Sequence, residues 1–251
     1  CLYSIHFGHV IAEETNTMVV TAFRTPVEAK EVGSSLSIIS EQEIENSEAK
    51  FVADLLREIP GLAVNRQGPV GKTTQIRIRG AEGNQVLVLI DGVEVNDLAS
   101  GSEFDFAHLS TENIARIEIL RGAQSAVWGS DALAGVINIV TKRGSGEHNV
   151  NAFAGIGSFA SLEAGGSVSG GNKIYHYLFS GSYIETNGIN VSAFGDEQDG
   201  YENKTFSLKT GVNPLDNFSV DFVLRHADAN SEIDNFNLSN MLIDDDRVSQ
   251  V

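Results

Sequence analysis

The chain has 251 residues, a formal net charge of −17, 41% hydrophobic residues and 20% charged residues. This length allows one large domain or two modest ones, and the composition is that of a folded chain. The acidity argues against nucleic acid as a partner, because nucleic-acid-binding proteins carry a basic surface. The sequence has no run of about 18 apolar residues, so it predicts no membrane-spanning helix.

The amino-terminal segment indicates a targeting function. Cys1 is the only cysteine, which excludes an intramolecular disulfide and a multi-cysteine metal site. Residues 1–12 are mostly apolar, end in Ala12 and are followed by acidic residues, so we interpret them as a signal-peptide remnant. Lipidation of Cys1 is the alternative.

Residues 13–25 form a linker that contains a short β-prone run. An exposed, extended segment is expected here, because nothing nearby in the sequence is an obvious pairing partner. The run consists of Thr17, Met18, Val19, Val20, Thr21 and Ala22.

Residues 26–143 carry the mixed helix and strand signals of a compact α+β domain. Ser40 and Glu43 form a capping box that begins a helix. Pro60 and Gly61 end a second helix, and Asp91 begins a tight turn. In chain order the predicted elements are a strand at 36–39, helices after 40 and at about 51–56, and strands at 76–78, 86–90, 117–120 and 136–140.

Beyond Gly144, apolar and polar residues alternate with a period of two. Phe218, Val220, Phe222 and Leu224 share one face of such a run. Alternating runs of roughly ten residues joined by turns are typical of an outer-membrane barrel, although a soluble β-sandwich has the same pattern. The remaining chain has room for about five strands with their loops.

Four segments between 76 and 142 occur in a distinctive order. They are IRIRG at 76–80, VLIDGV at 88–93, IEILRGAQSAVWGS at 117–130 and GVINIVTK at 135–142. Together they resemble the plug of the TonB-dependent outer-membrane receptors. The resemblance implies an α+β plug domain at 26–143, followed at 144–251 by the first strands of an antiparallel transmembrane β-barrel. That barrel is incomplete, because transporters of this kind close at about 22 strands.

The resemblance also implies a function and a place in the cell. A receptor of this family imports a scarce nutrient across the bacterial outer membrane, and the run at 17–22 is its TonB box. The inner-membrane protein TonB grips such a box through strand addition. A soluble ligand-binding or signalling module and a structural adhesin or colicin-docking surface are the alternatives. We find no catalytic constellation and predict that the protein is not an enzyme.

Within the family the strongest likeness is to the cobalamin receptors, in segments 85–96 and 188–205. A ferric-siderophore receptor is the alternative. Two plug loops, 65–71 and 96–102, are then expected to contact the ligand. The candidate ligand-binding residues in these loops are Asn65, Gln67, Gly68, Asn96, Asp97 and Ser100.

The same likeness implies calcium in the extracellular loops, since clustered carboxylate and carbonyl oxygens suit this ion. Asn190 stands where the family pattern has an acid, and solvated acidic loops without calcium are the alternative. The candidate calcium ligands are Asn190, Glu197, Asp199 and Asp228.

Several plug arginines lie near acidic residues in the sequence. Each has two possible roles, pairing with the polar wall of a barrel lumen or a structural role within the plug. These arginines are Arg77, Arg79, Arg116 and Arg121, and the acidic residues are Glu94, Glu112 and Glu118.

Overall fold

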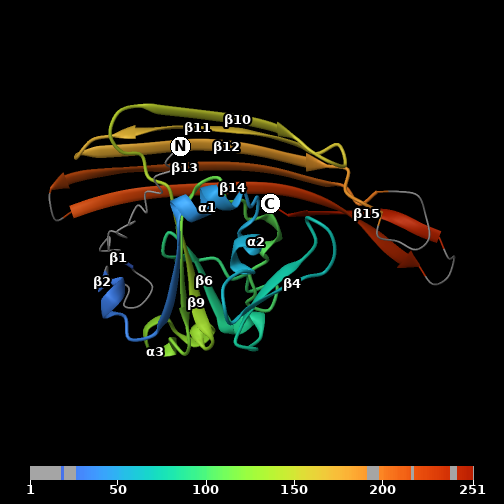
Figure 1. Cartoon of the computed structure of the whole chain (residues 1–251), viewed down its shortest axis with the longest axis horizontal. Coiled ribbons are helices and arrows are strands. Elements are labelled where there is room, and N and C mark those ends of the chain that lie inside the picture. Colours follow the sequence, from blue (N-terminus) through green and yellow to red (C-terminus); the bar gives the residue numbers. More distant parts are fainter. Residues whose placement is uncertain (1–17, 20–26, 191–197, 216–217, 238–241, 251) are drawn as a thin grey trace, which may run out of the picture.

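The computed structural model describes residues 18–19, 27–190, 198–215, 218–237 and 242–250, and the side chains within 27–232. A mixed domain, the plug (27–143, with the short strand β1 beside it), precedes a sheet of six strands, the wall (Figure 1). The plug strands are β1 Met18–Val19, β2 Val27–Glu28, β3 Ser35–Ser40, β4 Leu62–Arg66, β5 Thr74–Ile78, β6 Val86–Ile90, β7 Val93–Glu94, β8 Ile114–Arg121 and β9 Gly135–Thr141. The helices are η1 Ala29–Glu31, α1 Glu41–Ser47, α2 Val52–Leu56, η2 Gly83–Gln85, η3 Phe106–His108, α3 Ser125–Trp128 and η4 Ser130–Ala132. The wall strands are β10 Asn149–Ile156, β11 Leu162–Gly171, β12 Tyr175–Thr186, β13 Tyr201–Leu215, β14 Phe218–Asn237 and β15 Leu242–Gln250.

The centre of the plug is a five-stranded mixed sheet in the order β3-β8-β9-β6-β7, in which only β6 and β9 run parallel. Its central strands are rich in β-branched residues, which pack well on a pleated surface. Ile117, Ile119, Ile137 and Ile139 are completely buried in one hydrophobic core. The strands predicted at 36–39, 86–90, 117–120 and 136–140 are thereby confirmed, as is the one at 76–78 in β5.

Short-range signals placed α1 and α2 correctly, whereas α3 and the short 3-10 helices were not predicted. Ser40 begins α1 with the predicted capping box: Glu43 N donates to Ser40 Oγ at 3.3 Å, and Ser40 N donates to Glu43 Oε2 at 2.7 Å. The second helix, α2, ends before Pro60 and Gly61, and Gly61 has a φ of +85°. Within the described residues, no helix is long and apolar enough to cross a membrane.

The predicted turn after β6 is present. Asp91 and Gly92 have φ values of +50° and +81°, as a tight hairpin turn requires. The chain reverses there, and β7 pairs antiparallel with the end of β6.

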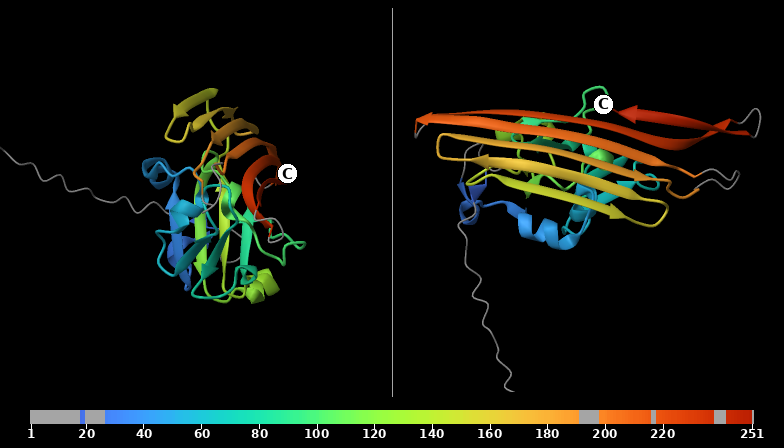
Figure 2. Two further views of the ribbon diagram at one scale, coloured as in Figure 1. Left: turned by 90° about the vertical axis from the view of Figure 1, so that its right-hand side faces the viewer. Right: turned by 90° about the horizontal axis from the view of Figure 1, so that it is seen from above.

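The wall is a single antiparallel sheet whose strands follow the chain order, and it curves around one side of the plug (Figure 2). One curved sheet, and not two packed sheets, rules out the sandwich interpretation for the described residues. Six strands fit where we expected about five, because three residues separate β11 from β12 and two separate β13 from β14. Short connections leave more of the chain for strands.

The two faces of the wall differ in chemistry, as the alternation predicted. The outward face is apolar along all four strands β11–β14, in a row across the sheet formed by the exposed Val168, Phe179 and Leu224 and the half-buried Leu208. The face toward the plug is polar and mostly small. It includes Asn149, Asn151, Ser167, Ser169, Ser180, Ser182, Thr205 and Ser207. A continuous exposed apolar surface of this kind suits contact with lipid.

The β-prone run at 17–22 has a partner that the sequence did not suggest. Met18 pairs with Glu28 and Val19 pairs with Val27 in a two-stranded antiparallel sheet, so our expectation of an unpaired segment is wrong for these two residues. The other four residues of the run lie outside the described part of the chain. Figures 1 and 2 place β1 and β2 beside the plug, near the end of the wall where β13 meets β14.

Three of the four plug arginines have partners within the plug. Arg77 pairs with Glu82 at 3.0 Å and Arg116 pairs with Glu118 at 2.8 Å. Arg121 donates to Ser37 Oγ at 2.7 Å and to the Pro60 carbonyl. The structural role within the plug is therefore confirmed for these arginines, and other residues join the plug to the wall.

Candidate functional site: the seam between plug and wall

The wall has two distinguishable ends. A connection of 14 residues, 187–200, joins β12 to β13 at one end, which we call the loop end. Residues 172–174 join β11 to β12 at the other, which we call the turn end. In outer-membrane barrels, short turns face the periplasm and longer loops face the outside.

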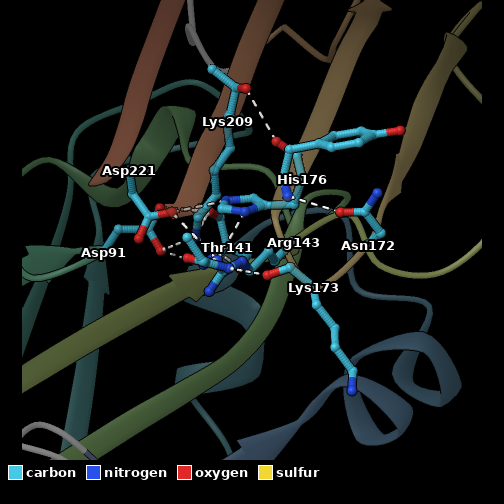
Figure 3. A network of polar contacts seen from close by, with 11 residues as sticks. Asp91, Thr141, Arg143, Asn172, Lys173, His176, Lys209 and Asp221 are labelled. Carbon is cyan, nitrogen blue, oxygen red and sulfur yellow. Dashed lines mark hydrogen bonds and ion pairs between the residues drawn. The ribbon is translucent and has the colours of Figure 1, made fainter. Parts of the chain in front are cut away.

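A buried ion pair joins plug and wall toward the turn end (Figure 3). Lys209 Nζ in β13 lies 2.8 Å from Asp91 Oδ1, in the turn after β6, and 3.0 Å from Thr141 Oγ1 at the end of β9. Thr141 N also donates to Asp91 Oδ1 at 3.0 Å. The two side chains of the pair are only 13% and 9% exposed. Their attraction is consequently screened little by solvent.

A second polar cluster holds the residue that follows the last plug strand. Arg143 NH2 lies 2.8 Å from His176 Nδ1 in β12, and His176 Nε2 lies 2.8 Å from Asp221 Oδ1 in β14 (Figure 3). The second of these contacts is within ion-pair distance but is not aligned for a hydrogen bond. Arginine donates only, so Nδ1 accepts and the imidazole can carry its proton on Nε2, facing Asp221. The connection from plug to wall is thus anchored on two wall strands.

Toward the loop end, the plug segment 67–73 lies against the wall. Lys72 Nζ is 3.1 Å from Asp199 Oδ1 and also donates to the Glu232 carbonyl. Ser231 Oγ donates to the Gly71 carbonyl at 2.8 Å. This segment is the connection between β4 and β5, in which ligand-contacting residues were predicted.

An aromatic contact extends the same junction into the plug. The His108 ring stacks on Tyr201 of β13, with ring centroids 5.7 Å apart, and His108 Nδ1 lies 3.1 Å from the Tyr201 hydroxyl. Burial lowers the pKa of His108 below its ordinary value, although Asp105 nearby acts in the opposite direction. The neutral imidazole is therefore favoured.

The first predicted plug loop brings Asn65, Gln67 and Gly68 to the edge of this junction. Asn65 is in β4, Gln67 N donates to the Thr73 carbonyl at 3.0 Å, and Gly68 has a φ of +153°. The adjacent Pro69 and Val70 line a hollow of about 560 Å³ between plug and wall. Its apolar lining includes Phe51 from the plug and Phe159, Ile184 and Ile189 from the wall.

The second predicted plug loop has a different internal structure. Both ends of the Asn96 amide bond the backbone: Oδ1 accepts from Val88 N at 2.8 Å, and Nδ2 donates to the carbonyls of Val86 at 3.0 Å and Ser102 at 2.8 Å. Asn96 therefore positions the loop. Asp97 accepts from Ser100 Oγ at 2.7 Å, and this hydrogen bond lowers the pKa of the exposed Asp97 carboxyl. Asp97 and Ser100 line an open hollow of about 500 Å³, and Asn96 is not part of its lining.

Another hollow, of about 750 Å³, separates the middle of the plug from the polar face of the wall. Glu112 and Asn113 line it from the plug, and Arg225 lines it from β14. Burial raises the pKa of the Glu112 carboxyl above its ordinary value, with a hydrogen bond from Ser182 acting against it. A polar gap thus remains between the middle of the plug and the wall.

The structure does not bring together the two described calcium candidates that carry a charge, Asp199 and Asp228. Asp199 is paired with Lys72 toward the plug, whereas Asp228 is opposite Lys204 in the β13–β14 register. Tyr201 of β13 faces the plug, where it stacks on His108. Lys204 is three positions further along the same strand, so it faces the opposite side of the wall, and so does Asp228 opposite it. Glu197 lies outside the described residues. Among those described, no group of three or more His, Cys, Asp and Glu side chains could hold a metal ion.

Sequence reasoning missed the residues that join plug and wall. Two of these residues are Lys209 and Lys72, and each has a partner more than 100 positions away in the sequence. A weak signal existed for Lys209, because it is a charged residue among small polar ones on the inward face. Its partner could not be identified from spacing.

Comparison with known proteins agrees with this architecture. A sequence profile of the family described as "TonB-dependent Receptor Plug Domain" matches residues 28–136. The vitamin B12 transporter BtuB of Vibrio vulnificus is 34% identical over 239 residues, which are 93% of this chain and 39% of that protein. The chain thus spans about two fifths of the length of this relative.

Two solved structures show the same arrangement of plug and strands. The ferripyoverdine receptor of the outer membrane of Pseudomonas aeruginosa superimposes with a TM-score of 0.71 at 16% identity, covering 86% of this chain and 28% of that one. The siderophore receptor PirA from Acinetobacter baumannii gives a TM-score of 0.62 at 25% identity, covering 78% and 31%. Residues 28–136 therefore match the plug domain of the TonB-dependent receptors, and the chain as a whole is similar to these receptors in having a plug followed by strands of a barrel.

Proposed function

We propose that this chain works in the TonB-dependent import of a scarce nutrient across the bacterial outer membrane. The supporting observation is the arrangement along the seam: the connection 67–73, which includes the predicted ligand residues Gln67 and Gly68, lies at the loop end, and β1 lies toward the other end. A plug between these two ends can pass a pull on the coupling segment to the ligand site. The exposed apolar face of the wall argues against a soluble module. No catalytic step is part of this proposal.

Cobalamin is the proposed cargo. The relative that shares 34% identity over 93% of this chain is a vitamin B12 transporter. The hollows beside the plug loops combine an apolar lining near Val70 with polar groups near Asp97, which suits a large ligand of mixed polarity. A ferric siderophore is the second candidate, since structural neighbours such as PirA are siderophore receptors.

Calorimetry on the protein in detergent distinguishes the two cargoes. We expect saturable heat with cyanocobalamin and none with ferric pyoverdine. Substitution of Asp97 by Asn, together with Ser100 by Ala, should weaken cobalamin binding, whereas Glu31 to Gln in η1 is the matched control and should not. If the protein binds the ferric siderophore and not cyanocobalamin, the cargo is a siderophore and the cobalamin proposal is wrong.

We further propose TonB as the partner of the segment Thr17–Ala22. The two described residues of the segment pair with the plug, Met18 with Glu28 and Val19 with Val27. A ladder of two pairs can exchange for a longer one on the edge of another protein's sheet. Val20→Pro removes a backbone donor and should abolish uptake of cyanocobalamin into cells while leaving binding intact. Glu13→Pro, placed before the segment, is the control, and normal uptake by the Val20 variant would contradict the proposal.

A further inference from the structure

Lys72 is enclosed at the contact between plug and wall. Its Nζ lies 3.1 Å from Asp199 Oδ1, and the same ammonium donates to the Glu232 carbonyl. The Lys72 side chain is 13% exposed and that of Asp199 is 4% exposed. Buried charges are retained where they are paired and hydrogen-bonded, so this is a built contact and not a chance surface pair.

The backbone beside Lys72 is shaped for this contact. Gly71 has a φ of +89°, and a Cβ at this position would lie 2.2 Å from the Tyr201 ring. Ser231 Oγ donates to the Gly71 carbonyl at 2.8 Å. Glu232 completes the junction by accepting from Gly200 N at 3.1 Å, next to Asp199. The plug loop and the end of the 187–200 connection are thus held by one set of neighbouring residues.

The calcium ligands implied by the family resemblance do not fit this arrangement. One oxygen of Asp199 already faces an ammonium, and a divalent cation on that oxygen would be repelled by it. Asp228 faces the other side of the wall, with Lys204 opposite it. Asn190 brings no charge. The one other described candidate that carries a charge, Asp228, is therefore not placed to share an ion with Asp199.

We propose that the Lys72 ammonium is the resident cation of the Asp199 carboxylate, so that the plug loop and the loop end of the wall are joined without a divalent cation. This inference rests on the proposed receptor function. Because lysine is part of the chain, its charge is present at the carboxylate at all times, whereas a free ion must be captured from solution. The junction also makes the two loops interdependent, since withdrawal of the plug loop leaves Asp199 buried without this partner.

Hydrogen exchange measured by mass spectrometry tests the junction in the absence of any cargo. The protein in detergent is compared in EDTA and in millimolar CaCl₂, and exchange is followed in segments 67–73 and 198–203. We expect the same exchange in both buffers for the unaltered protein. Lys72→Met should accelerate exchange in both segments by about tenfold, because each loses its partner.

Two variants serve as controls. Lys50→Met breaks another plug–wall ion pair, with Glu163 at 2.7 Å, whose lysine is 53% exposed, and it should leave both segments unchanged. Asp199→Asn should reproduce the Lys72→Met effect, and exchange in β6 must stay slow in every variant used. Calcium-dependent slowing in the unaltered protein, or unchanged exchange in both the Lys72 and Asp199 variants, would overturn the proposal. Neither result depends on which nutrient binds, so an error in the proposed cargo can be distinguished from an error in the proposed Lys72–Asp199 junction.

Discussion

Lys209 Nζ in the wall lies 2.8 Å from Asp91 Oδ1 in the plug, and this buried pair ties the turn after the central strand β6 to the barrel. Asp91 is also bonded by Thr141 N, so the contact reaches the end of β9. Both β6 and β9 belong to the central plug sheet. The wall thus contacts the plug at the ends of two strands of its central sheet. The plug cannot leave the wall as a unit without breaking this ion pair.

Loss of the Lys209 charge should loosen the plug. Lys209→Met leaves the Asp91 carboxylate buried without its ammonium partner. Removal of one partner of a buried ion pair lowers the free energy of unfolding by on the order of 3 kcal/mol. We expect a lower denaturant midpoint for plug unfolding, followed by the fluorescence of Trp128. Lys204→Met is the matched control, because Lys204 pairs with Glu202 on the outward face and is 56% exposed. Equal midpoints for the two variants would show that the buried pair has no special role.

A methyl group at Gly71 should disturb the loop junction. Gly71→Ala is strained by a φ of +89° and also drives Cβ into the Tyr201 ring. Gly80→Ala is the matched control, because Gly80 has a φ of +82° and nothing within 4 Å of the added Cβ. Both changes should destabilise the protein by about 1 kcal/mol through the backbone. We expect a further loss of about 1–3 kcal/mol at Gly71 alone from overpacking, measured by chemical denaturation.

Acidification should weaken the contact of His108 with the wall. Burial lowers its pKa in the folded protein, so the unfolded chain binds this proton more readily. The stabilisation is complete above the unfolded value of about 6.5 and is lost as the pH falls through the lower folded value. Denaturation at pH 8 and at pH 5 should therefore show a larger stability drop for the unaltered protein than for His108→Gln. The same drop in both proteins would assign the pH dependence to other groups.

An arginine should be tolerated on one face of the wall and not on the other. Val168 belongs to the outward apolar row, whereas its neighbour Ser167 lines the polar hollow. Val168→Arg exposes a charge to lipid, which costs about 2–4 kcal/mol near the middle of a membrane. We expect reduced assembly of this variant into membranes, measured by resistance to heat in gel electrophoresis, and near-normal assembly of Ser167→Arg. Reversed results would place the opposite face of the sheet against lipid.

The local features of this protein follow from the sequence. Ser40 and Glu43 cap α1, Asp91 and Gly92 make the turn, and the alternation around Phe222 gives the outward face of the wall. Each depends on residues a few positions apart, whose geometry is set by backbone sterics and period. The resemblance of segments 76–142 likewise identified the plug, which the family match confirms.

The tertiary structure decided which distant residues meet. Lys72 finds Asp199 across 127 positions, and Lys209 finds Asp91 across 118, because the curved wall carries its inward side chains to the plug surface. It also gave Met18 and Val19 a partner in β2, and it turned Asp228 away from Asp199. The charges of the side chains show which residues can form ion pairs. Because an ion pair acts over only a few ångströms, the positions of the strands in the folded protein decide which pairs form.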